Sequence, residues 1–398
     1  MSKLRVSELT KVFGSRPKRA LELMEQGRSR SEILEATGQL LAVAEVDLKI
    51  EEGELFVVMG LSGSGKSTVI RMLNRLIEPT AGTVEIDGER IDQLDPSALR
   101  SVRQSKLSMV FQHFALFPHR TVGENAAYGL KVQGVNEDER RTRATEALET
   151  VGLGDRVDAY PNELSGGMQQ RVGLARGLAT KADILLMDEP FSALDPLIRR
   201  DMQDLLATLQ SELNRTIVFI THDLNEAMRL GDRICVLKDG RVVQVGTGPE
   251  IIDNPADDYV ADFVSDVDRS RVLTAEQTMR PVRRTFSPDD KPRTVLDWLD
   301  EQEFSGAYVV DRDKRILGVA RDDRLANGVR SGATSIADLL TQDYATARYD
   351  TPLSDLAGMA ANSTVPIAVT DDTGQLFGIV PRARLLAALS SQEVEVDA

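Results

Sequence analysis

The chain has 398 residues, of which 41% are hydrophobic and 28% are charged, and its formal net charge is −15. A chain of this length exceeds one compact core, so we expect two or three domains. The acidic balance disfavours nucleic acid as a main partner, and one cysteine with three histidines disfavours a zinc site. We find no apolar run of about 18 residues and no signal-peptide core at the N-terminus, which predicts a protein that is neither membrane-spanning nor exported.

The N-terminal segment is predicted as two strands separated by an inserted helical hairpin. Residues 4–13 and 41–50 have strand patterns, and apolar side chains alternate along the second of them. The insert, at about residues 15–40, contains an apolar helical stripe. Within it, Ser29 and Glu32 fit a capping box, which predicts the start of a second short helix.

Residues 60–67 fit the phosphate-binding pattern G-x-x-x-x-G-K-[ST] at every fixed position. An apolar strand pattern at 55–59 precedes them and a helical pattern at 68–73 follows, a context that the motif needs and that disfavours a plain Gly/Ser-rich turn. The glycines let backbone N–H groups point at phosphate oxygens, and the helix adds its positive N-terminal end. Lys66 would reach the β- and γ-phosphates, and Ser67 would ligate Mg²⁺. The predicted nucleotide contacts here are Gly60, Ser62, Gly63, Ser64, Gly65, Lys66, Ser67 and Thr68.

Polar residues also follow other apolar strands. The strand pattern at 184–187 ends in Asp188 and Glu189, and residues 216–220 lead to His222. Because strands alternate with helices and the polar residues lie at strand ends, we expect a mainly parallel sheet with its site along that edge. The alternative for the acidic pair is a cap for the next helix.

Two further segments lie between the phosphate motif and the acidic pair. A short strand pattern at 109–112 ends at Gln112 and continues into an aromatic segment at 113–119. A Ser-Gly-Gly sequence then opens a helix, so that its N–H groups and the helix dipole suit an anion. These three residues are Ser165, Gly166 and Gly167.

The C-terminal third contains a weak internal repeat of about 60 residues. Two strand patterns at 307–311 and 316–320 are echoed at 366–371 and 376–380, each pair with an acidic turn between its strands and helical patterns on either side. Such a repeat predicts two copies of one unit packed together.

In this order, the motifs resemble the ATP-binding subunit of an ATP-binding-cassette (ABC) transporter, over about residues 4–264. The resemblance implies hydrolysis of ATP with Mg²⁺. Glu189 corresponds to the general base that polarises the attacking water, and His222 to the residue that holds the γ-phosphate and the base. The implied catalytic residues are Lys66, Gln112, Glu189 and His222, and the implied metal contacts are Ser67, Gln112 and Asp188.

The same resemblance implies partners. Two cassettes would sandwich two ATP molecules head to tail, with residues 165–167 on the γ-phosphate of the other copy and Asp195 signalling across the interface. Phe13 matches the aromatic residue that stacks on adenine, with an ordinary core phenylalanine as the alternative. Segment 114–119 lies where the family docks its membrane permease, with a core aromatic segment as the alternative.

The C-terminal repeat resembles a tandem pair of cystathionine-β-synthase (CBS) domains, which in their families sense adenine nucleotides, cyclic dinucleotides or ionic conditions. The usual ribose-binding residues are replaced here by Arg321 and Arg324 in the first copy and by Pro381 and Arg384 in the second. This departure puts ATP or AMP binding in doubt and leaves arginines that suit a cyclic dinucleotide or an anionic membrane surface. Solvated arginines, or a pair that only dimerises, are the alternatives.

The expected fold is an α/β P-loop NTPase cassette, with a mainly parallel sheet and a helical subdomain, followed by an α+β tandem CBS pair. This combination resembles the ATPase subunit of importers for glycine betaine, proline betaine and carnitine, peripheral on the cytoplasmic face of the membrane with a permease and a substrate-binding protein. An importer for another small polar solute and a soluble ABC ATPase acting on ribosomes or DNA are the alternatives. The expected domains are residues 1–265 (cassette), 266–275 (linker), 276–330 and 335–390 (CBS domains) and 391–398 (acidic tail).

Overall fold

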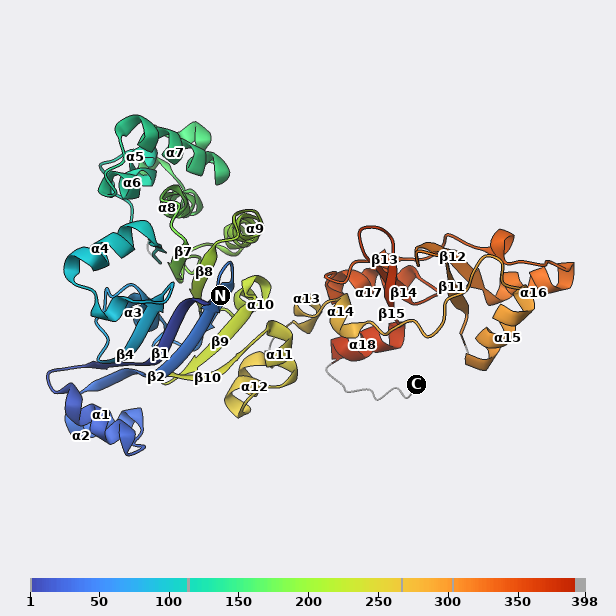
Figure 1. Cartoon of the computed structure of the whole chain (residues 1–398), viewed down its shortest axis with the longest axis horizontal. Helices are drawn as coiled ribbons and strands as arrows, with labels where there is room; N and C mark the ends of the chain where they lie inside the picture. Colours follow the sequence, from blue (N-terminus) through green and yellow to red (C-terminus); the bar gives the residue numbers. More distant parts are fainter. Residues whose placement is uncertain (1, 113–114, 266–267, 303, 391–398) are drawn as a thin grey trace. The chain divides into compact units, whose positions relative to one another are not determined.

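The computed structural model describes residues 2–112, 115–265, 268–302 and 304–390 (Figure 1). The chain divides into two compact units, residues 1–267 and 268–398. No helix in the described part of the chain is both long enough and apolar enough to span a membrane. Phe114, from the predicted docking segment, His113 before it, and the predicted acidic tail at 391–398 lie outside the described residues.

A six-stranded sheet forms the centre of the first unit, with the strand order β10-β9-β3-β8-β7-β6. Neighbouring strands are parallel except for β10, which is antiparallel to β9. Every residue of β3, β7 and β8 is buried, which explains why these strands are continuous apolar runs in the sequence. The mainly parallel sheet is therefore confirmed. Its strands are β3 (Leu55–Met59), β6 (Leu107–Val110), β7 (Ile184–Asp188), β8 (Thr216–Thr221), β9 (Arg233–Lys238) and β10 (Arg241–Gly246).

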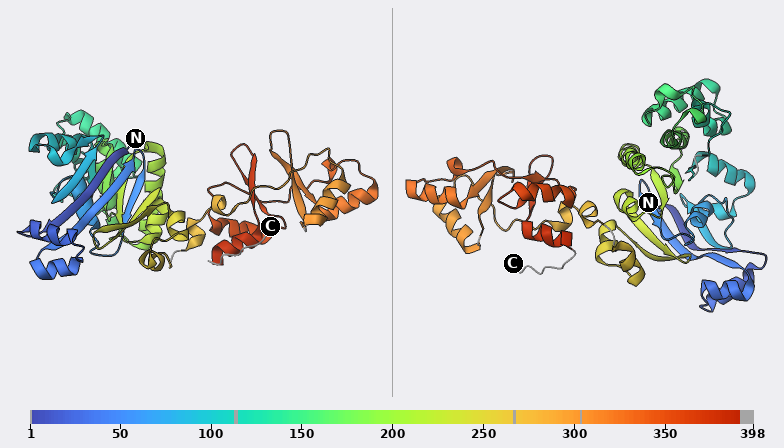
Figure 2. Two further views of the ribbon diagram at one scale, coloured as in Figure 1. Left: turned by 60° about the horizontal axis from the view of Figure 1, so that its bottom comes forward. Right: turned by 180° about the vertical axis from the view of Figure 1, so that it is seen from behind.

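The first unit also contains an antiparallel sheet with the strand order β2-β1-β4-β5. The chain between β1 and β2 forms two short helices, α1 and α2, which lie beyond one end of these strands in every view (Figure 2). A small apolar core, made of residues from the two helices and the two strands, attaches them to the sheet. The elements are β1 (Ser2–Phe13), α1 (Pro17–Glu25), α2 (Arg30–Thr37), β2 (Leu40–Glu51), β4 (Ala81–Ile86) and β5 (Glu89–Arg90).

Helices surround the central sheet, and α5 to α8 pack on one another as a helical subdomain (Figure 1). Asn125, which is fully buried, holds the segment before α5, because its side chain both accepts from the Phe117 N–H and donates to the Phe117 carbonyl. The helices are α3 (Lys66–Leu73), α4 (Pro96–Ser105), α5 (Val122–Ala126), α6 (Tyr128–Val132), α7 (Glu137–Thr150), α8 (Gly166–Ala179), α9 (Pro196–Leu213), α10 (Leu224–Leu230), α11 (Gly248–Asp253) and α12 (Asp258–Val264).

The second unit contains the predicted repeat. In each copy an antiparallel strand pair lies between two helices, and both pairs have a register irregularity at the same place, next to Gly318 and Gly378. The two copies are joined through their turns, where the Leu376 N–H donates to the Lys314 carbonyl at 3.0 Å. The elements are α15 (Pro292–Gln302), β11 (Gly306–Val310), β12 (Ile316–Arg321), α16 (Asp322–Ser331), β13 (Thr346–Ala347), α17 (Leu353–Asn362), β14 (Ile367–Thr370), β15 (Leu376–Val380) and α18 (Arg382–Ser390).

The second unit begins with two short helices, α13 (Arg269–Val272) and α14 (Ala275–Thr278), where a linker was expected. Leu273 and Ala275 are buried in the apolar core of the second copy, against α17 and α18. Leu273 and Ala275 therefore belong physically to the second unit.

Candidate active site

Close backbone approach explains the glycines of the phosphate loop. Gly60 has a φ of +149°, and a Cβ there would lie 2.2 Å from the Leu237 carbonyl oxygen. Gly65 has a φ of +103°, and a Cβ there would lie 2.6 Å from the Ala42 carbonyl oxygen. A side chain at either position would both strain the backbone and collide with a neighbouring strand, so the loop can curl in this way only with glycine.

The Lys66 side chain is buried inside this loop. Its Nζ donates to the carbonyl oxygens of Gly60, at 2.9 Å, and Leu61, at 3.1 Å, and lies 3.9 Å from a carboxylate oxygen of Glu189. Burial lowers the pKa of Lys66, and the negative charges of Glu189 and Asp188 oppose this effect. The loop thus has a cation at its centre.

The other predicted loop contacts have different exposures. Ser62 and Gly63 are exposed, Ser67 and Thr68 are half-buried, and the buried Ser64 hydroxyl has no hydrogen-bond partner among the described residues. An added Cβ at Gly63 would meet nothing within 4 Å, so the loop is open on that side.

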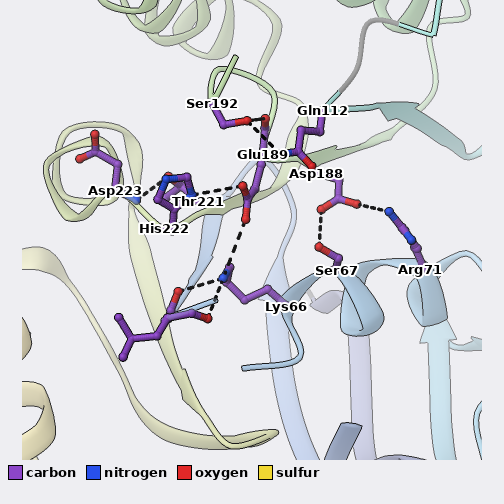
Figure 3. A network of polar contacts seen from close by, with 12 residues as sticks. Lys66, Ser67, Arg71, Gln112, Asp188, Glu189, Ser192, Thr221, His222 and Asp223 are labelled. Carbon is purple, nitrogen blue, oxygen red and sulfur yellow. Dashed lines mark hydrogen bonds and ion pairs between the residues drawn. The ribbon is translucent and has the colours of Figure 1, made fainter. Parts of the chain in front are cut away.

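Asp188, at the end of β7, is held by two side chains of α3 (Figure 3). The Ser67 hydroxyl donates to its Oδ1 at 2.8 Å, and the Arg71 guanidinium donates to its Oδ2 at 3.1 Å. Only 4% of the Asp188 side chain is exposed, so the cation beside it compensates a buried charge. Sequence reasoning missed Arg71, although its position one helical turn after Ser67 places both on one face of α3.

Glu189 follows Asp188 and has a φ of +46°, the left-handed region that a glutamate seldom adopts. The turn brings its carboxylate towards the end of β8, where His222 Nδ1 lies 3.1 Å from Glu189 Oε2 (Figure 3). The structure therefore brings together the two residues predicted as base and partner, from different strands. Strain at this position is typical of a functional turn.

Gln112 lies just beyond β6, which ends at Val110, two residues before the predicted strand end. Its Nε2 donates to the Ser192 hydroxyl at 3.3 Å, and that hydroxyl donates to the Glu189 carbonyl at 3.0 Å. Ser192 thus connects the Gln112 segment to the turn that carries Glu189. Sequence reasoning gave it no role of its own.

The predicted Ser-Gly-Gly segment lies at the start of α8. Ser165 and Gly166 are exposed, and the Ser165 hydroxyl accepts from the Met168 N–H at 3.4 Å as the helix cap. Asp195 caps α9 in the same way, accepting from the Ile198 N–H at 3.1 Å. Within the described residues, no hydrogen bond joins either cap to the phosphate loop of its own chain.

Phe13 is the last residue of β1 and is 40% exposed, so it is not a core residue. The Lys11 ammonium lies 5.1 Å from the centre of its ring. An exposed ring at the edge of the sheet suits stacking on a planar group.

The oxygen atoms around Ser67 and Asp188 fit a hard cation such as Mg²⁺, which prefers oxygen ligands and uses one or two carboxylates together with substrate phosphates. In keeping with this, no cluster of three or more His, Cys, Asp or Glu side chains in the described part of the chain forms a self-contained metal site. Ser67 and Asp188 could therefore hold Mg²⁺ beside a bound nucleotide, and Gln112 stays a predicted third contact.

A second candidate site is a cleft of about 1140 Å³ between the two copies of the C-terminal repeat. Among the described residues, its lining contains aromatic side chains and one carboxylate, that of Glu301. The arginines in the lining are Arg280, Arg283, Arg284 and Arg382.

None of the arginines singled out from the sequence in the C-terminal repeat lines this cleft. Arg321 lies 3.6 Å from Asp323 and 3.8 Å from Asp343, and Arg324 donates to the Leu340 carbonyl at 3.1 Å. These two arginines therefore have local acceptors, and the cleft takes its arginines from residues 280–284, a segment without a recognisable motif, and from Arg382 at the start of α18.

A phosphate loop between a strand and a helix, carboxylates and a histidine at the ends of parallel strands, and a separate helical subdomain define a class of protein. That class is the ATP-binding-cassette ATPase. The family model described as "ABC transporter" matches residues 43–192, and the model described as "CBS domain" matches residues 336–391.

Similarity to known proteins identifies the family within this class. A glycine betaine/carnitine transport ATP-binding protein of Listeria monocytogenes is 49% identical over 399 residues, covering 100% of both chains. A glycine betaine/proline betaine transport system ATP-binding protein of Escherichia coli is 48% identical over 397 residues, covering 98% of both. Among solved structures, a dimeric ATP-binding cassette in a post-hydrolysis state with ADP and phosphate is 35% identical with a TM-score of 0.53, covering 62% of this chain and 98% of that one. The chain belongs to the family of ABC transporter ATP-binding proteins that serve glycine betaine transport systems.

Proposed function

We propose that the chain hydrolyses ATP to drive the import of glycine betaine, proline betaine or a related osmolyte through a partner permease. The contact between His222 and Glu189, beside Lys66 and Asp188, is the observation that carries the catalytic part of this proposal. The names of its full-length relatives support the choice of solute.

In this reaction Glu189 is the general base, because its carboxylate lies at the strand end, within reach of the loop that would hold the γ-phosphate. His222 fixes the orientation of that carboxylate. Lys66 stabilises negative charge on the β- and γ-phosphates, and Gln112 lies beside the same turn to contact the attacking water. Mg²⁺, when bound at Ser67, Asp188 and Gln112, supplies charge neutralisation on the phosphate oxygens.

Exposed caps at Ser165 and Asp195 support a head-to-tail homodimer. A helix N-terminus with free N–H groups suits the γ-phosphate of an ATP molecule held by a second copy. The dimeric cassette among the structural relatives supports this arrangement. We infer that the dimer binds the permease on the cytoplasmic face of the membrane, and through it a substrate-binding protein.

Regulation by the C-terminal unit is the second part of the proposal. Among the described residues that line the cleft, arginines outnumber carboxylates, and Arg283, Arg284 and Arg382 favour an anionic ligand, with a cyclic dinucleotide as the first candidate and the anionic headgroups of a membrane as the second. The Debye length is about 8 Å at physiological salt, so the attraction between exposed charges weakens as salt increases. Binding of an anion to these arginines would therefore also respond to ionic strength.

Uptake by the reconstituted transporter tests the proposal. The full chain, its permease and its binding protein are placed in vesicles, and ATP-driven uptake of labelled glycine betaine is measured against internal salt. We expect uptake that depends on ATP and increases with salt. Salt-independent uptake would overturn the regulatory part, and uptake of another polar solute in place of betaines would overturn the choice of solute.

A further inference from the structure

The inserted hairpin places one side chain at a fixed position. Helix α2 begins with a complete capping box, in which the Ser29 N–H donates to Glu32 at 2.8 Å and the Glu32 N–H donates to the Ser29 hydroxyl at 3.3 Å. Arg30 is the first residue of this helix and is half-buried. The cap fixes the start of α2, and the apolar core fixes the hairpin on β1 and β2. The Arg30 side chain is therefore attached to a backbone position that is well fixed.

Arg30 contacts the phosphate loop. Its Nη1 donates to the carbonyl oxygen of Gly63 at 2.9 Å, a contact across 33 residues of sequence. The carbonyl oxygens of Gly60 and Leu61 are held by Lys66, the cation of the loop itself. The carbonyl of Gly63 is thus held by a cation from outside the motif.

This contact has two physical effects on the loop. A charged donor on the Gly63 carbonyl polarises that peptide group, whose Ser64 N–H donates to the Leu61 carbonyl at 3.1 Å, and so strengthens this internal turn of the loop. The guanidinium also adds positive charge beside a loop whose ligand is an anion, in a chain with a net charge of −15. The added charge favours bound phosphate, and the two hydrogen bonds restrict the exposed end of the loop.

We propose that Arg30 is a positioning residue for the phosphate loop, and that the inserted hairpin is therefore part of the nucleotide site. The inference rests on the proposed function, since it takes ATP to be the ligand of this loop. Arg30 acts through the backbone of the loop and not on the reacting atoms, so it should affect nucleotide affinity and leave the chemical step unchanged.

The test compares Arg30→Ala with Arg28→Ala in the full chain. Arg28 is a matched control, because it is a cation of the same hairpin that pairs with Glu32 at 3.0 Å and not with the loop. Binding of a fluorescent ATP analogue and steady-state hydrolysis are measured for both variants. We expect Arg30→Ala to weaken binding and raise KM for ATP by about five- to tenfold, the effect of losing one partly exposed hydrogen bond to a charged group, with kcat within about twofold.

Two further results complete the test. Arg30→Lys keeps a cationic donor and should recover at least half of the lost affinity, whereas Arg28→Ala should bind like the wild type. Provided that the wild type binds the ATP analogue, two results would overturn the inference. One is wild-type affinity in Arg30→Ala, and the other is a loss of affinity in Arg28→Ala as large as that in Arg30→Ala. A wild-type chain that binds no ATP analogue would instead overturn the proposed function.

Discussion

Charged side chains gather in two places in this molecule, and they are arranged differently. In the nucleotide site the carboxylates have cations beside them: Asp188 has Arg71, and Glu189 has Lys66. In the cleft of the C-terminal unit, the described residues of the lining include four arginines and one carboxylate, that of Glu301. A site whose charges balance one another keeps its geometry before a ligand arrives, whereas a cleft with excess positive charge gains most when an anion binds.

The largest effect is expected from a variant that tests whether ATP hydrolysis in the nucleotide site needs the Glu189 carboxylate. Glu189→Gln keeps the shape of the side chain and removes the base, so we expect phosphate release to fall by about 100-fold or more while ATP still binds. Phosphate release and binding of an ATP analogue are measured together. Glu250→Gln, a change at the exposed cap of α11, is the control and should hydrolyse ATP normally. Robust turnover in Glu189→Gln would remove Glu189 from the role of base.

The charge excess of the cleft gives the next effect. Replacing Arg283 and Arg382 with alanine removes two of its four cations, so we expect binding of a fluorescent cyclic dinucleotide to weaken by about tenfold or more. Arg321→Ala, outside the cleft and beside Asp323, should bind normally. If the full chain binds vesicles of anionic lipid but no cyclic dinucleotide, the membrane surface is the ligand; binding of neither would leave the cleft without the proposed role.

Arg71→Ala tests the balance of charge in the nucleotide site. Without its ion pair the buried carboxylate of Asp188 is less compensated, so we expect the melting temperature to fall by about 2–4 °C in the absence of nucleotide. Mg²⁺ with ATP should reduce this difference, because a bound cation would neutralise the same carboxylate. Arg19→Ala, which breaks an exposed pair with Glu22, should show little change in either condition. An equal difference with and without Mg²⁺ and ATP would contradict the role of Asp188.

The smallest expected effect is an absence of reaction. Cys235 is fully buried in β9, and burial raises the pKa of its thiol to about 12. At pH 8 the thiol is therefore both inaccessible and protonated, and a thiol reagent should label the native chain negligibly. After unfolding, one equivalent should react. Rapid labelling of the native chain would show that β9 opens more readily than its place between β10 and β3 implies.

The sequence predicted the parts of the site in which chemistry requires certain residue types at fixed spacing. The loop at 60–67, the acidic pair after β7 and His222 after β8 are of this kind, and the alternating strands predicted that they lie on one edge of a sheet. Arg71, Ser192 and Arg30 are different, because each acts through a contact with a residue far along the chain. Such contacts depend on packing, which no local pattern encodes.

The structure differs from the sequence-based expectation in the central sheet and in the C-terminal unit, and both differences have the same physical origin. Gln112 was expected at the end of a strand, but β6 ends at Val110, where pairing with Met187 of the neighbouring strand stops. Arg283 and Arg284 line the cleft although their segment has no motif, whereas Arg321 and Arg324 hydrogen-bond or pair locally. Neither the end of a strand ladder nor the direction of an arginine side chain follows from the residue itself.

Because Cys235 is buried, the chain is suited to site-specific labelling with spectroscopic probes. It is the one cysteine of the sequence, and it lies inside the central sheet of the first unit. A cysteine introduced at an exposed site, such as the tip of the inserted hairpin or the rim of the arginine-lined cleft, would be the reactive thiol of the native protein. Spin labels or fluorophores could then report on dimer closure or on the C-terminal unit while the native core stays unaltered.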